Sequence, residues 1–103
     1  MVIIISAGGQ IIEVDEDAFL SNTQRYAGIV GNNIRAYEGM NNLSPSHIKV
    51  IQFFMDFYNG QSQVNPTEQQ ITQGTGLSAD KIRRLFPKST SNSGIGIIKF
   101  KKK

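Results

Sequence analysis

The sequence contains no cysteine and a single histidine. Without thiols the chain cannot form disulfide bonds, build a zinc site on thiolates or use a cysteine nucleophile. The histidine, His47, has no acidic residue or second histidine four positions further along, where a metal site on a helix needs its partner. We therefore expect a histidine that belongs to the core or to a helix cap.

Long apolar segments are also missing. The apolar start, Val2 to Ile5, is too short for the hydrophobic region of a signal peptide and is preceded by no basic residue. No later run approaches the roughly 18 apolar residues that suggest a membrane-spanning helix. We therefore expect a cytoplasmic protein without a membrane segment, and a length of 103 residues indicates one domain with a single core.

The patterns of common catalytic sites are absent as well. The candidate acids Asp15, Glu16, Asp17 and Glu38 fall at helix-capping or solvated positions, where they are poor choices for acid-base chemistry. No serine stands in a nucleophile elbow, and no glycine-rich turn is followed by the Lys-Ser or Lys-Thr of a phosphate loop. We predict that the protein is not an enzyme and holds neither metal nor cofactor.

Acidic residues are missing from the C-terminal end. The net charge is only +3, but every Asp and Glu lies at or before Asp80, and all the charged residues beyond it are basic. Such a distribution suits a phosphate backbone or an acidic protein surface, and a solubilising tail is the alternative. The basic residues after Asp80 are Lys81, Arg83, Arg84, Lys88, Lys99, Lys101, Lys102 and Lys103.

Two β-branched runs open the chain. Val2 to Ile5 and Gln10 to Val14, separated by Gly8 and Gly9, predict a β-hairpin. Asp15 to Asp17 place acids at the start of a short helix. Thr23 to Glu38 then predicts a helix ended by Gly39. Its expected buried face is Tyr26, Ile29, Val30, Ile34 and Tyr37.

The central segment, Ser44 to Tyr58, predicts a helix capped by Ser44 with Pro45 at its first position. Its polar positions recur at steps of three and four, so they lie along one narrow solvent-exposed face of an otherwise apolar helix. We expect other helices to wrap it. The polar positions are Lys49, Gln52 and Asp56.

Further signals come after this helix. Asn65-Pro66-Thr67-Glu68 supplies a cap, a first-turn proline and a capping-box glutamate for a helix to about Gln73. The turn at 74–76 leads to a helix capped by Ser78, and Pro87 closes the globular part. The segment Lys88 to Gly96 is rich in Ser, Thr, Asn and Gly, which favours a mobile arm.

The stretch 66–86 is spaced like a helix-turn-helix, with Ile71, Leu77, Ile82 and Leu85 as its shared core. A structural helical corner is the alternative, favoured because the second helix is short and no Asn or Gln reader stands beside its arginines. If the corner binds DNA, it does so together with the basic tail. The candidate nucleic-acid-binding residues are Lys81, Arg83, Arg84 and Lys88.

Together these elements predict a mostly α fold. We expect a small orthogonal helical bundle with an N-terminal β-hairpin, a helix-turn-helix-like corner and a flexible basic C-terminal arm. The predicted domain covers residues 1–87, with the hairpin at about 2–14, and the arm covers 88–103.

The order of motifs resembles that of the DsrC/TusE family, the gamma-subunit-like proteins of dissimilatory sulfite reductase and of the sulfur relay for tRNA thiolation. The resemblance spans roughly residues 10 to 87. It is carried by the segments 12–20 (IEVDEDAFL) and 43–51 (LSPSHIKVI), by the tyrosine-ended helix to Tyr58, by Pro66 and by 85–87 (LFP).

The resemblance implies a compact helical bundle whose C-terminal arm bears cysteine, receives and passes on sulfur, and inserts into a partner. Here Gly96-Ile97-Ile98-Lys99-Phe100 stands where the family has Gly-Leu-Pro-Lys-Pro, which puts the terminal cysteine position at Lys103 and the upstream one within 91–95. Neither cysteine is present. Ile48 replaces the family's tryptophan, and Gln69 and Gln73 replace basic residues.

Three functions stay open: a regulatory or decoy protein that binds the family's partners without passing sulfur, a nucleic-acid binder, and a structural module unconnected with sulfur. We favour the first, with a sulfur-relay or sulfite-reductase-like protein as partner and DNA binding as the alternative. The expected partner-binding residues are Ile97, Ile98, Lys99, Phe100, Lys101, Lys102 and Lys103.

Overall fold

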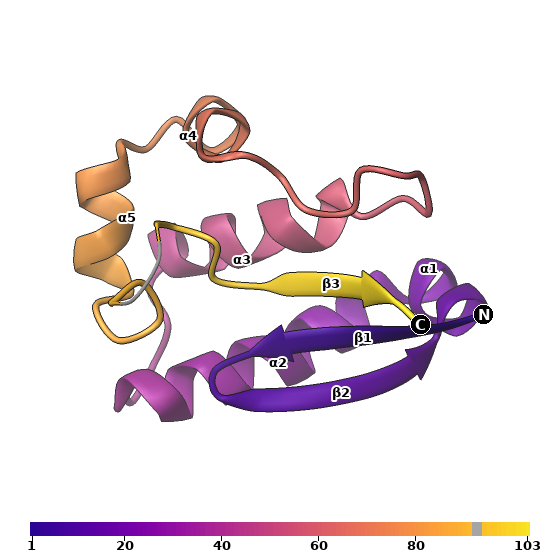
Figure 1. Cartoon of the computed structure of the whole chain (residues 1–103). Helices are drawn as coiled ribbons and strands as arrows, with labels where there is room; N and C mark the ends of the chain where they lie inside the picture. The colour runs from indigo at the N-terminus through magenta and orange to yellow at the C-terminus, as the bar shows by residue number, and fades with distance from the viewer. Residues whose placement is uncertain (92–93) are drawn as a thin grey trace.

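The computed structural model describes residues 1–91 and 94–103 as an antiparallel sheet with helices packed on one of its faces (Figure 1). Residues 92 and 93, part of the predicted arm, lie outside the described residues. The strands, in the order β2-β1-β3, are β1 (Val2–Ala7), β2 (Gln10–Asp15) and β3 (Lys99–Lys102). The helices are α1 (Glu16–Ser21), α2 (Thr23–Glu38), α3 (Pro45–Phe57), α4 (Glu68–Thr75) and α5 (Ala79–Leu85).

The predicted hairpin is present and turns on two glycines. Gly8 and Gly9 have φ angles of 58° and 71°, and positive values at both central residues suit the right-handed twist of the flanking strands. A Cβ atom on Gly8 would lie 2.5 Å from the backbone oxygen of Asn33 in α2. The turn is therefore packed directly against that helix. Glycine at position 8 allows both the positive φ angle and this close approach.

Most predicted helix ends are confirmed. Gly39 ends α2 in the left-handed conformation with φ 74°, and the Ser44 side chain accepts the backbone N–H of His47 at the start of α3. The start of α4 was predicted wrongly: its cap is Thr67, paired in a capping box with Gln70 and not with Glu68. Thr67-x-x-Gln70 fits the capping-box pattern equally well, and the amide of Asn65 is engaged elsewhere.

The flexible C-terminal arm is the main correction. Lys99–Lys102 pairs antiparallel with β1, with Phe100 opposite Ile5. The Asn65 side chain covers the outer edge of this strand, since it accepts the N–H of Phe100 at 2.8 Å and donates to its carbonyl at 3.0 Å. The core therefore continues well beyond Pro87. The buried side chains beyond it include Ile95, Ile97, Ile98 and Phe100, each at most 5% exposed.

The mostly helical composition was predicted correctly, but the sheet is larger than a hairpin. Helix α3 runs through the core, yet its predicted wrapping by other helices is incomplete because Ile48 remains 52% exposed. The predicted face of α2 is also only partly buried: Val30 and Ile34 are inside, whereas Ile29 and Tyr37 are 38% and 43% exposed. The orthogonal packing of the helices stays a prediction. Within the described ranges no helix is long and apolar enough to cross a membrane.

Candidate functional site

Strand β3 sorts the predicted partner-binding residues into two groups. Ile97, Ile98 and Phe100 are buried in the core, so their side chains are not available on the surface. Lys102 is partly buried and its ammonium group donates to the carbonyl of Gly60. The exposed members are Lys99, Lys101 and Lys103. The structure therefore exposes only lysines of a segment that was predicted to dock through both apolar and basic residues.

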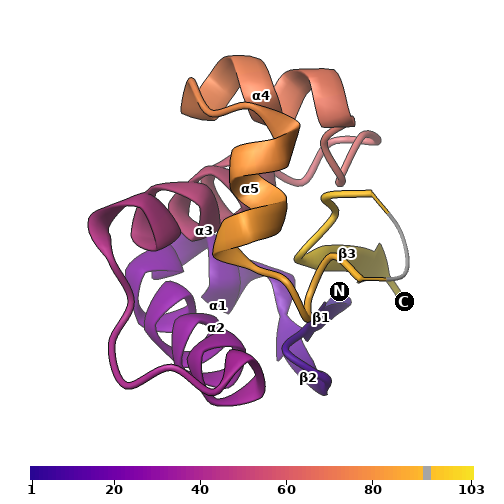
Figure 2. The same ribbon diagram turned by 90° about the vertical axis from the view of Figure 1, so that its left-hand side faces the viewer.

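These lysines belong to the face of the sheet that points away from the helices, which we call the outer face. In Figures 1 and 2 the helices lie on one side of the sheet and none is drawn over the other. The register places acidic residues on one side of β1 and basic residues on the other. The outer face comprises Ile11, Glu13 and Asp15 of β2, Val2, Ile4 and Ser6 of β1, and Lys99, Lys101 and Lys103 at the C-terminal strand.

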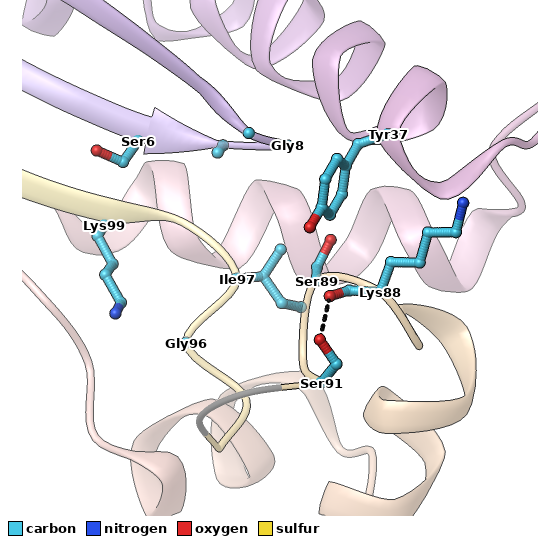
Figure 3. A pocket seen from close by; sticks show the side chains of 11 residues that line it. Ser6, Gly8, Tyr37, Lys88, Ser89, Ser91, Gly96, Ile97 and Lys99 are labelled. Carbon is cyan, nitrogen blue, oxygen red and sulfur yellow. Dashed lines mark hydrogen bonds between the residues drawn. The ribbon is translucent and has the colours of Figure 1, made fainter.

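A cavity of about 240 Å³ lies where the hairpin turn, the end of α2, the segment after α5 and the start of β3 meet (Figure 3). In this view the hydroxyl groups of Tyr37 and Ser89 turn toward the same space, while the ammonium groups of Lys88 and Lys99 extend away on opposite sides. The lining residues are Ser6, Ala7, Gly8, Gly9, Tyr37, Lys88, Ser89, Ser91, Gly96, Ile97 and Lys99.

The wall of this cavity contains an unpaired polar group. Within the described ranges, the Oγ atom of Ser89 is buried without a hydrogen-bond partner, a situation that costs about 1–3 kcal/mol unless water or a ligand atom satisfies it. The backbone N–H groups of Lys88 and Ser89 donate to the carboxylate of Glu38 at 3.0 and 2.7 Å. In the described ranges the cavity lining offers serine and tyrosine hydroxyl groups and two lysines, but no histidine or carboxylate.

The helix-turn-helix-like corner has its predicted core and the predicted cap of its second helix. Ile71 and Ile82 are buried, and Ser78 caps α5. The predicted nucleic-acid-binding residues, however, do not form one free cluster. Arg83 lies 3.4 Å from the Asp80 carboxylate and 3.7 Å from that of Glu68. Lys88 lines the cavity instead, which leaves Lys81 and Arg84 exposed on the helix.

His47 is a cap and core residue, as predicted. Its Nδ1 atom accepts the backbone N–H of Ser44 at 3.2 Å, and its Nε2 atom contacts the carbonyl of Leu85 at 2.8 Å, which makes Nε2 the protonated nitrogen. The ring therefore ties the start of α3 to the end of α5. Among the described residues no three potential metal ligands come together.

Sequence reasoning did not find the cavity or the pair formed by Tyr58 and Glu16. The Tyr58 hydroxyl donates to the Glu16 carboxylate, and burial together with this acceptor raises the pKa of Tyr58 well above its usual range. The two residues are separated by 42 positions. The cavity draws on four separate segments. Neither arrangement leaves a local pattern in the sequence.

Fold and site together define a small, mostly helical domain with a three-stranded sheet and a cavity beside the hairpin turn of that sheet. A family model described as "DsrC like protein" matches residues 6–97. The dissimilatory-type sulfite reductase subunit gamma of Nitratidesulfovibrio vulgaris (strain Hildenborough) is 31% identical over 79 residues, which is 77% of this chain and 74% of that protein. No solved structure gives a significant match. The chain belongs to the DsrC-like family.

Proposed function

We propose that this chain is a DsrC-like protein of sulfur metabolism that acts by binding protein partners and does not carry sulfur itself. One observation carries the proposal: the family match covers residues 6–97 of a chain that has no cysteine. Transfer of sulfur as a persulfide needs a thiolate to attack and hold the sulfur atom. Neither lysine nor serine replaces a thiolate in this chemistry.

The relative's name supplies the class of partner. That protein is called the gamma subunit of a dissimilatory-type sulfite reductase. We infer that this chain binds the other subunits of such an enzyme, or a related sulfur-relay protein, in a regulatory role. The family match ends at residue 97, before β3, so the family scaffold is retained while the C-terminal strand falls outside the match.

The burial of the apolar side chains in the C-terminal segment limits how a partner can bind. Insertion of this segment into a partner would pull Ile97, Ile98 and Phe100 out of the core. Burial of one such side chain is worth about 1.5–3 kcal/mol, so removing all of them is expensive. Binding through lysines that are already exposed avoids this cost. We therefore infer that the partner presents an acidic surface to Lys99, Lys101 and Lys103 while β3 stays in the sheet.

A disulfide between β1 and β3 tests this mode of binding. Ser6 and Lys99 are register partners, and opposed antiparallel residues have Cα atoms about 4.5–5.5 Å apart, within disulfide range. In the variant Ser6→Cys/Lys99→Cys, the oxidised form holds the strand in place and the reduced form is the matched control. Biolayer interferometry measures affinity for the purified partner subunits of a dissimilatory-type sulfite reductase.

We expect both forms to bind equally, and Lys101→Glu to weaken binding about tenfold through like-charge repulsion. Lys81→Glu, the same charge change on α5, is the control and should have little effect. Binding by the reduced form alone would show that the strand must leave the sheet. No binding by the unmodified chain would overturn the proposed function.

A further inference from the structure

The outer face of the sheet separates acidic from basic side chains. Glu13 and Asp15 form an acidic row on β2, and lysines form a basic row on the opposite side of β1. Between the two rows lie Val2, which is 39% exposed, and the partly buried Ile4. Ile11 on the acidic side is 72% exposed. Apolar groups this open on a sheet face suit a partner surface.

The strand register aligns these rows residue by residue. Ile4 lies opposite Glu13 on one side and Lys101 on the other. One step along the same face, Val2 lies opposite Asp15, and its carbonyl accepts the N–H of Lys103 at 3.0 Å. Two lines across the outer face therefore run from an acid through an apolar residue to a lysine, whereas the line through Ser6 joins Ile11 to Lys99.

We propose that this face binds a second copy of the chain, in a dimer whose two-fold axis runs along β1 between the two sheets. Rotation about such an axis exchanges the two sides of the sheet and keeps each residue at the same position along the strand. Glu13 then faces Lys101 of the partner subunit, and Asp15 faces Lys103 of the partner subunit. Each charged contact occurs twice, as an isologous interface requires.

The charges also select this orientation over its alternative. A two-fold axis across the strands would place β2 over β2 and β3 over β3, so acids would face acids and lysines would face lysines. Like charges held against each other cost free energy and suppress a wrong pairing. With the axis along β1, Ile4 packs against its own copy. The two sheets then lie about 10 Å apart with aligned strands, the common arrangement for sheets packed face to face.

The area of the outer face indicates a weak dimer. Three strands of this length, spaced about 4.8 Å apart, cover roughly 300 Å², whereas a stable complex buries roughly 800 Å² of surface on each partner. The ion pair between Lys103 and Glu13 within one chain, at 3.2 Å, joins side chains that are 57% and 56% exposed. Exposed pairs contribute about 0–1 kcal/mol, so this pair exchanges readily for intermolecular contacts. The dimer is therefore transient and sensitive to salt.

Sedimentation equilibrium of the purified chain, from about 10 μM to 1 mM, tests the dimer. We expect association that depends on concentration and weakens at least tenfold between roughly 50 and 500 mM salt. Glu13→Lys and Lys101→Glu should each weaken it at least tenfold. Asp56→Lys and Lys81→Glu carry the same charge changes on α3 and α5, away from the outer face, and should leave it unchanged.

Charge exchange gives the sharpest test. An equimolar mixture of Glu13→Lys and Lys101→Glu restores both opposite-charge contacts, so association should return, and the double variant should associate with itself. A chain that stays monomeric at every concentration would overturn the proposal, as would a dimer that the control variants weaken equally. Because purified chain alone is used, failure of the dimer leaves the partner binding proposed above intact. If both exist, they exclude each other, since they use the same lysines.

Discussion

At the scale of single residues, this fold depends on side chains that bond to the backbone of distant segments. The amide of Asn65 pairs with Phe100, and the carboxylate of Glu38 accepts two N–H groups after α5. The ring of His47 reaches the end of α5. Only the role of His47 was predicted from the sequence, because a helix cap is local. A hydrogen bond from a side chain to backbone tens of residues away produces no periodic pattern in the sequence.

Two helical glycines make a matched pair for measuring close approach. A Cβ atom on Gly74 in α4 would overlap the ring of Phe53, whereas one on Gly28 in α2 would meet open space. We expect Gly74→Ala to destabilise the protein by about 1–3 kcal/mol through overpacking. Gly28→Ala should stabilise it by up to about 1 kcal/mol through helix propensity. Urea unfolding measures both, and equal stabilisation by the two variants would contradict the packing of α3 against α4.

Tyr58 makes stability depend on pH at the alkaline end. Because its pKa is raised in the folded state, the unfolded chain loses this proton first, near the usual tyrosine value of about 10. Above that pH the folded state binds more protons than the unfolded state, so stability falls as pH rises. We expect the free energy of unfolding to fall less steeply above about pH 10 in Tyr58→Phe. Parallel curves for the variant and the unmodified chain would contradict a role for this proton.

At the scale of elements, the sequence predicted those parts whose signals are local. The hairpin follows from Gly8 and Gly9 between β-branched runs, and α3 follows from Ser44-Pro45. Strand β3 was missed because a short strand is defined by its partner, and its partner β1 is almost a whole chain length away in sequence. The alternation of Ile98, Lys99, Phe100 and Lys101 was the available signal.

Strand β3 contributes to stability, in contrast to a mobile arm. The ring of Phe100 lies 5.6 Å from that of Phe19 and 4.9 Å from that of Tyr58, measured between centroids. Phe100→Ala should cost about 3–5 kcal/mol, as is usual for a buried phenylalanine. Its exposed neighbour provides the control, since Lys101→Ala should change stability by less than about 0.5 kcal/mol. Denaturant titration measures both. If both variants are as stable as the unmodified chain, the C-terminal segment is a mobile arm and not part of the core.

At the scale of the whole molecule, the fold converts a linear charge asymmetry into a pattern across one sheet. The acidic residues Glu13 and Asp15 come from the N-terminal part of the chain and the lysines from its end, yet β1 holds both rows side by side. The sequence revealed the asymmetry but not its placement, because placement depends on the pairing of β3. Family membership and the absence of cysteine are the two observations from which we proposed a function without sulfur transfer.

The same charge pattern predicts which residues contribute to nucleic-acid binding. A net charge of +3 supports only weak binding to duplex DNA, independent of base sequence and falling steeply with salt. We expect Lys101→Gln to weaken this binding, because Lys99 and Lys101 of β3 are exposed side by side on the outer face. Arg83→Gln should change it little, because Asp80 and Glu68 already lie beside that guanidinium. Mobility-shift titrations at two salt concentrations compare the variants, and a dominant loss with Arg83→Gln would instead identify the helix-turn-helix-like corner as a DNA-binding element.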